Sequence, residues 1–392
     1  MSIAATVVLY PSPGIGHLIS MVELGKLILT RHPSFSITIL TTTTSFNTGS
    51  TAPYLRRVSS TTPSITFHHL PLIPLDPASF PSMEAITFEL LRLNTPHVCR
   101  SLLSLSTTIA AFIIDLFCTP ALPLGSELNI PTNYFFTSGA GCLDYFLYLP
   151  IIHQNINQSF NDLNTDLHFP NLPPIPAADM PSPMLERNST EYECFIDFLN
   201  HMPKSDGIIV NTFEALEPRA VKAISDGLCV PNGVTPPVFC IGPLIASGEG
   251  RGGGDVEECL TWLDTQPSRS VVFLCFGSLG LFTGEQLKEI AIGLERSGQS
   301  TMVAWPLYAE QRLNRVLLVK EMKVALWMNE SESGFVTAEE VEKRVTELMD
   351  SEEGKAVRDR VKAASEGARE AMSEGGSSRV ALAKLVESWK QS

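Results

Sequence analysis

ATVVLYPSPGIGHLI, residues 5–19, predicts a buried strand, a tight turn containing Gly14 and Gly16, and the first turn of a helix. The amphipathic segment 18–31 continues that helix. This order is typical of α/β folds built on a parallel sheet, whose ligands bind at the carboxyl ends of the strands. A dinucleotide-binding fingerprint would need a third glycine at position 19, where the chain has Ile19, so NAD binding is disfavoured.

Strand-like apolar runs alternate with helix-period segments along the following part of the chain, which is the pattern of an α/β fold. Further predicted strands cover 36–42, 64–70, 109–115, 130–136 and 206–210. The last of these runs into a predicted capped helix near residue 218. Together these elements predict one parallel-sheet domain over residues 1–244.

A second domain is expected because 392 residues exceed what one core usually organises. The glycine-rich segment 245–258 is interpreted as a linker, and a phosphate loop is disfavoured because its Lys-Ser/Thr ending is absent. Within 259–392 we expect strands over 270–278 and 302–306, helices over 283–298 and 309–322, and a helical tail to Trp389. Thr337 and Glu340 predict a capping box.

The composition disfavours several kinds of partner and site. The formal net charge of −14 disfavours nucleic acid or an anionic membrane as a partner, because either would need a basic face. Eight cysteines without a CxxC pair indicate neither a zinc site nor a disulfide framework. The N-terminus lacks a basic region before Lys26, and no apolar run approaches the roughly 18 residues of a spanning helix. We therefore expect a cytoplasmic protein with reduced thiols.

His17 is the first candidate for chemistry, because the glycine turn delivers it to the carboxyl end of the predicted sheet. An imidazole there suits a general base near neutral pH. A helix-capping or merely surface histidine is the alternative. From its position in the sequence alone, both interpretations remain open.

Asp115 ends a strand that should lie in the same sheet as the strand preceding His17. A carboxylate there could hold the second imidazole nitrogen, as the aspartate of a hydrolase triad does. It could equally cap the turn that follows the strand. No GxSxG nucleophile elbow accompanies the pair, so the proton removed would come from a bound acceptor molecule.

Ser278 is a third candidate, in the segment CFGSLG, 275–280, which leads from a predicted strand to a helix. Its hydroxyl and the free amides of the turn could bind a phosphate. A generic strand-to-helix turn is the alternative.

Seven motifs together resemble the plant family-1 UDP-glycosyltransferases, which glycosylate flavonoids and other small phenolics. In chain order they are PSPGIGH (11–17), FIIDLFC (112–118), YFFTSGA (134–140), GIIVNTFEALEP (207–218), IGPL (241–244), FLCFGS (273–278) and WPLYAEQ (305–311). The resemblance implies a GT-B fold, in which two Rossmann-like domains face each other across a cleft. The first would hold mainly the acceptor and the second mainly the UDP-sugar.

On the acceptor side, the resemblance implies that His17 is the base and Asp115 its partner. The variable stretches 75–95 and 140–200 would line the acceptor pocket. The implied reaction is an inverting displacement of UDP, with glucose as the default sugar.

On the donor side, the resemblance implies that Thr137 approaches the sugar and Ser278 the diphosphate. Glu310 and Gln311 would form hydrogen bonds with the sugar hydroxyls. No metal or other cofactor is implied, and a monomer is expected.

One signature of that family is missing from this chain. In the family a tryptophan stacks on uracil, and an HCGWNS-type turn holds phosphate and ribose before a WP…[D/E]Q ending. Here only the ending is present, within 305–311, and every histidine lies at or before His201. The strand resembling RFLWVV that follows the 283–298 helix in the family is also missing. We interpret this as an internal deletion near residue 300 that leaves the second domain incomplete.

Two hypotheses follow. The chain is an enzyme that transfers a hexose from a UDP-sugar to a small phenolic, or it is a catalytically silent form that binds acceptors or pairs with a full-length relative.

Overall fold

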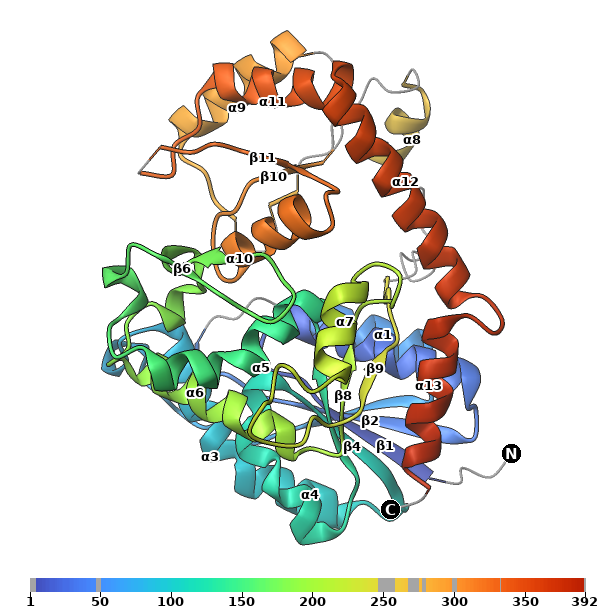
Figure 1. Cartoon of the computed structure of the whole chain (residues 1–392). Coiled ribbons are helices and arrows are strands. Elements are labelled where there is room, and N and C mark those ends of the chain that lie inside the picture. Colours follow the sequence, from blue (N-terminus) through green and yellow to red (C-terminus); the bar gives the residue numbers. More distant parts are fainter. Residues whose placement is uncertain are drawn as a thin grey trace.

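The computed structural model describes residues 5–46, 51–245, 258–266, 275–276, 280–297, 302–331 and 333–390 (Figure 1). A seven-stranded, wholly parallel sheet organises the first part of the chain. Across the sheet the strands run β3 (Ile65–His69), β2 (Phe35–Thr41), β1 (Ala5–Tyr10), β4 (Ile109–Asp115), β5 (Thr132–Phe136), β8 (Gly207–Val210) and β9 (Val238–Cys240). All the strands predicted before residue 211 are confirmed, and the bounds of β4 agree to the residue.

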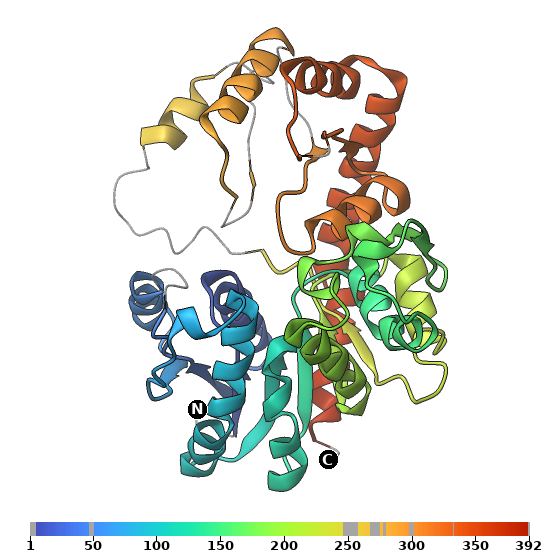
Figure 2. The same cartoon turned by 90° about the vertical axis from the view of Figure 1, so that its left-hand side faces the viewer.

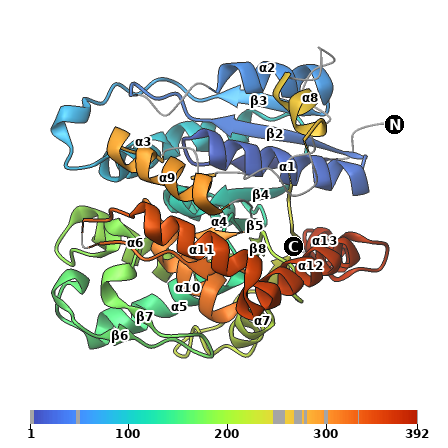
Figure 3. The same ribbon diagram turned by 90° about the horizontal axis from the view of Figure 1, so that it is seen from above.

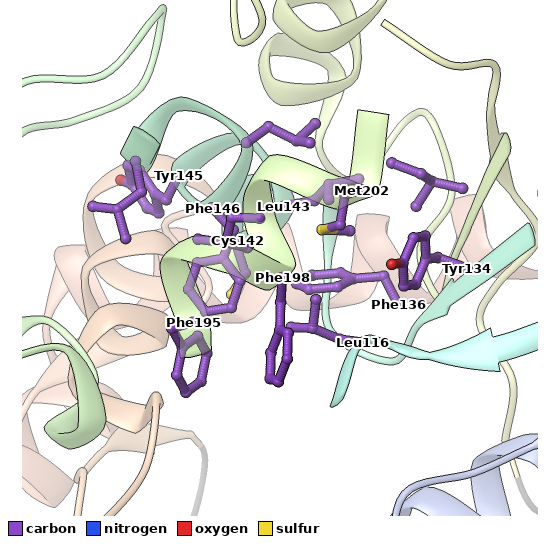
Figure 4. Close-up of a cluster of buried hydrophobic side chains, with 14 of the residues drawn as sticks. Leu116, Tyr134, Phe136, Cys142, Leu143, Tyr145, Phe146, Phe195, Phe198 and Met202 are labelled. Atoms are coloured by element: carbon purple, nitrogen blue, oxygen red, sulfur yellow. The ribbon is translucent and has the colours of Figure 1, made fainter. Parts of the chain in front are cut away.

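Helices cover both faces of this sheet, because successive strand residues point to opposite sides. Val7 and Leu9 pack beneath α1 (Ile15–Arg31) and α2 (Ala52–Thr61), whereas Val8 and Tyr10 face the other side. That side carries α3 (Met83–Ser104), α4 (Pro123–Leu128), α5 (Ala140–Asn155), α6 (Thr190–His201) and α7 (Pro218–Ser225). Aromatic and aliphatic side chains of β5, α5 and α6 fill the layer between them (Figure 4).

The excursion between α5 and α6 carries only a small antiparallel pair, β6 (Asp166–Leu167) and β7 (Ile175–Pro176), with short 3-10 turns around it. One of these turns, Ala177–Asp179, places the largely buried Asp179 against the second part of the chain.

The second unit lies above the carboxyl edge of the sheet (Figure 2). Its described elements begin with α8 (Glu258–Asp264), α9 (Gly284–Ser297), β10 (Val303–Ala304), α10 (Gln311–Val316), a π-helical turn (Leu317–Glu321) and β11 (Leu326–Trp327). In the described part of this unit, strands β10 and β11 form a parallel two-stranded sheet. The predicted strand 270–278 falls outside the described residues apart from 275–276.

Two expectations for this unit are confirmed in part. The helix predicted over 309–322 begins at Gln311 and widens into a π turn at Leu317, which seats Leu317 against the first domain. Thr337 does cap the next helix, α11 (Ala338–Asp350), by accepting the Glu340 N–H. The Glu340 carboxylate, however, accepts from the Asn329 N–H and the Arg344 side chain, so the reciprocal half of the capping box is replaced by contacts between elements.

The last three helices lead from the second unit back to the first sheet. Helix α11 lies beside α9 (Figure 3), and α12 (Glu352–Met372) then descends past the second unit to α13 (Ser377–Ser388). Helix α13 packs beside β9, and Ser378 Oγ donates a hydrogen bond to the Gly242 carbonyl at 2.6 Å. Helix α13, although it belongs to the range 259–392, therefore covers the same face of the first sheet as α1 and α2.

The seven cysteines whose side chains the structure describes are all free thiols. No helix in the described part of the chain combines the length and apolar composition that crossing a lipid bilayer requires.

Candidate functional site

Three predicted site residues lie at one edge of the sheet. Strands β1, β4 and β5 are neighbours, with Tyr10 opposite Ile114 and Asp115 opposite Phe135. His17 follows β1 after the glycine turn, Asp115 ends β4, and Thr137 directly follows β5. Because all three strands are parallel, their carboxyl ends place these residues on the same side, as predicted.

The turn after β1 is shaped by Gly14, whose φ of 119° is a conformation that L side chains rarely adopt. This turn starts α1 one residue later and sets His17 in its first turn. The His17 side chain is 32% exposed, so the ring reaches solvent while one edge faces the sheet. His17 is therefore neither a purely surface histidine nor a core one.

His17 Nδ1 lies 2.8 Å from Asp115 Oδ2. Since the carboxylate can only accept, Nδ1 carries the proton, and Nε2 of the neutral ring keeps its lone pair. Burial lowers the pKa of His17, but the charge and hydrogen bond of Asp115 and the charge of Glu310 outweigh it and raise that pKa above its usual value. The arrangement stabilises an imidazolium, as a general base requires after taking a proton.

Asp115 is buried and held from several sides. Oδ1 accepts from Ser12 Oγ at 2.6 Å and from the Phe117 N–H at 3.2 Å. Burial raises the pKa of Asp115, but its contacts with His17, Ser12 and the Phe117 amide lower it overall, so the group is a carboxylate. The two interpretations of Asp115 are both correct, because it caps the turn Leu116–Ala121 and also orients His17.

Ser12 belongs to the candidate site through its hydrogen bond to Asp115, and sequence reasoning missed it. It lies within the quoted motif PSPGIGH, but only the glycines and His17 were assigned roles. Its partner is 103 residues away, so only the neighbouring positions of β1 and β4 reveal the contact.

An aromatic wall adjoins His17. The Phe117 ring lies 5.8 Å from the imidazole, and Phe88 and Phe195 lie 5.3 Å and 5.5 Å from Phe117. Phe88 comes from the stretch 75–95 and Phe195 from 140–200, the two stretches expected to line an acceptor pocket. Phe117 is half-buried beside His17, whereas Phe88 and Phe195 are buried behind it, so Phe117 is the ring of the three that could contact an aromatic molecule.

The predicted donor-side residues are only partly brought together. Glu310 precedes α10, and its charge is among the causes that raise the pKa of both His17 and Cys142. Gln311 uses its side-chain oxygen to accept the Leu307 N–H at 2.7 Å, so part of this side chain stabilises its own turn. Ser278 and the predicted deletion point near residue 300 lie outside the described residues.

Glu217 is the second residue that sequence reasoning missed. Helix α7 was expected to be capped, and Glu217 does occupy the position before it, but without a side-chain cap bond to its own helix. Its carboxylate accepts instead from the first amides of α5, directly after the Thr137 turn.

No family model matches the chain. It is 44% identical to UDP-glycosyltransferase 88B1 of Stevia rebaudiana, covering 98% of this chain and 99% of that protein. It is 42% identical to an anthocyanidin 5,3-O-glucosyltransferase of a Rosa hybrid cultivar, with the same coverage. The alignment with the Stevia protein spans 460 residues against the 392 of this chain, so that relative carries residues this chain lacks.

Among solved structures, the chain resembles Phytolacca americana UGT2 complexed with UDP-2fluoro-glucose and pterostilbene. The TM-score is 0.89 and the sequence identity 32%, covering 99% of this chain and 100% of the other. This likeness confirms the predicted α/β fold of the GT-B type.

Proposed function

The chain belongs to the plant UDP-glycosyltransferases, and we propose that it moves a hexose, by default glucose, from a UDP-sugar to a hydroxyl of a small phenolic such as a flavonoid. The named relatives support this acceptor class, since one acts on anthocyanidins and another was solved with pterostilbene. The observation that carries the proposal is the Ser12–Asp115–His17 chain of hydrogen bonds at the edge of the sheet, beside an aromatic wall.

In the proposed mechanism His17 Nε2 takes the proton of the acceptor hydroxyl. The acceptor oxygen bonds to the anomeric carbon while the bond from that carbon to UDP breaks, so UDP leaves with the electron pair and the configuration inverts. The carboxylate of Asp115 stabilises the imidazolium that forms, and Ser12 and the Phe117 amide keep that carboxylate charged and aligned.

The proposed donor site comprises Thr137, Ser278, Glu310 and Gln311. Thr137 lies at the same sheet edge as Asp115, and the charge of Glu310 is one of the causes of the raised pKa of His17, so both support a donor site near the proposed reacting centre. As the resemblance to the family implies, the proposed reaction uses no metal. We further propose an acceptor-binding domain at 1–244, a linker at 245–258 and a donor-binding domain at 259–392, whose last helix α13 packs on the acceptor-binding domain, in a cytoplasmic monomer.

A specific observation favours the alternative of a catalytically silent chain. The alignment of 460 residues against a chain of 392 supports an internal deletion, and the two strands in the described part of the second unit have two residues each. A donor domain without its nucleotide-binding turn would leave acceptor binding in the first domain as the remaining activity.

Calorimetric titration of UDP and UDP-glucose into the folded 392-residue chain tests the proposal, with the Stevia relative as control. Saturable binding, followed by a glucoside product with a phenolic acceptor, supports the enzyme. Failure of the chain to bind where the control binds supports the silent form. In an active chain, an unchanged rate for His17→Ala would remove His17 from the mechanism.

A further inference from the structure

The carboxylate of Glu217 is buried in the first domain, with 2% of the residue exposed. It accepts the Ala140 N–H at 2.9 Å, the Gly141 N–H at 2.8 Å and the Thr212 hydroxyl at 2.5 Å. Burying a charge is costly, and charge-assisted hydrogen bonds together with the positive end of a helix offset that cost. The two amide hydrogen bonds therefore hold the Glu217 carboxylate at the start of α5.

The local sequence of α5 fits this carboxylate closely. A Cβ on Gly139 would lie 2.5 Å from Glu217 Oε2, so the side chain rests directly against that backbone. A Cβ on Gly141 would lie 2.7 Å from Leu317 Cδ2. Glycine at these positions allows the Glu217 carboxylate and Leu317 to approach the same helix start from two directions.

This contact restrains the turn that carries Thr137. The turn 137–139 spans only three residues between β5, which is fixed by its neighbours β4 and β8, and the start of α5, which Glu217 holds. With both ends held, the position of Thr137 relative to Asp115 on β4 has little freedom.

The same helix start contacts the donor side. Leu317 lies in the π turn that continues α10, and α10 begins directly after Glu310. A helix start displaced by the loss of Glu217 would therefore disturb both the Thr137 turn and the packing beneath Glu310.

We infer that Glu217 is a positioning residue, which fixes where Thr137 and the α10 segment lie relative to the His17–Asp115 pair. The catalytic consequence of this inference rests on the proposed function. The restraint on the turn 137–139 is independent of that function.

The variant Glu217→Gln tests the restraint, with Glu214→Gln as control, because Glu214 is exposed in the same loop. The amide keeps the size of the side chain but loses its charge and presents N–H groups toward backbone donors. We expect amide hydrogen exchange in segment 137–142 to become about tenfold faster, with the β1 and β4 amides unchanged. Unchanged exchange in that segment, or equal acceleration across the whole chain, would overturn the inference.

Turnover provides the second measurement where the wild-type chain is active. Glu217→Gln should lower kcat about 10- to 100-fold while the acceptor KM stays near its wild-type value, and adding Thr137→Val should cost little more. Additive losses, or a change in KM alone, would contradict positioning through Thr137. An inactive wild type would refute the proposed function, and the exchange experiment would still decide the restraint.

Discussion

Trp389, near the end of the chain, donates a hydrogen bond from Nε1 to Asn133 Oδ1 at 2.8 Å, across 256 positions of sequence. Asn133 lies on β5 and is fully buried, and Trp389 is 6% exposed. The indole also meets the Phe35 ring edge-on, with the ring centroids 6.3 Å apart. The tail after the second unit is thus part of the core of the first domain.

Trp389→Phe should lower the free energy of unfolding by about 1 to 3 kcal/mol, because it leaves the buried Asn133 carbonyl unpaired. Urea unfolding followed by circular dichroism measures the change. Trp262→Phe is the control, since Trp262 is 57% exposed and should change stability by less than about 0.5 kcal/mol. Equal effects of both substitutions would show that the hydrogen bond contributes nothing specific.

Asp115→Asn should lower the pKa of His17. Both the charge and the charged hydrogen bond that raise it are lost, whereas burial, which lowers it, remains. An NMR titration of the His17 ring measures this shift without requiring turnover. In an active chain the rate should rise with pH as His17 loses its proton, and the variant's profile should move to lower pH with a reduced maximum. A His17 pKa that is unchanged in the variant would exclude this coupling.

Asp144 should make the protein less stable as pH rises from about 4 to 7. Burial, aided by repulsion from Glu321, raises the pKa of Asp144 to about 7. Between the unfolded and folded pKa values the unfolded chain has lost the proton that the folded chain keeps, so stability falls by about 1.4 kcal/mol per pH unit. The stability that protonated Asp144 contributes is fully present below about pH 4 and is lost above about pH 7.

Asp144→Asn should therefore flatten the pH dependence and stabilise the protein at pH 8. Urea unfolding from pH 5 to 8 measures both, and Asp162→Asn, at an exposed aspartate, is the control. A variant with the same slope as the wild type would assign the pH dependence to other groups.

Arg315 joins the second unit to the first domain. It is 4% exposed, lies 3.5 Å from Asp179 and 3.3 Å from Glu330, and stacks with its guanidinium 3.8 Å from the centre of the Trp327 ring. Arg315→Met should cost about 3 kcal/mol, because it leaves two largely buried carboxylates with a weaker partner.

Arg312 is the matched control for Arg315. It approaches the same two carboxylates, but its side chain is 45% exposed. Arg312→Met should cost at most about 1 kcal/mol. Guanidinium unfolding compares the two variants, and equal losses would contradict the distinction drawn from burial.

Much of the first domain was predictable because its signals are local. The apolar run that ends at Asp115 matches β4 in full, and the glycine turn before His17 starts α1 as expected. The prediction that both residues share one edge needed only the rule that parallel strands align their carboxyl ends. The absence of an HCGW turn is likewise a property of the sequence alone.

Tertiary structure alone decided which side chains meet. Hydrogen bonds join Ser12 to Asp115, Glu217 to the start of α5, and Trp389 to Asn133. The two partners of each bond are separated by more than 70 positions of sequence. Hydrophobic periodicity determines which residues face inward, because it depends on neighbours along the chain. It carries no information on strand order or on which helix covers which face, and those two features determined every one of these contacts.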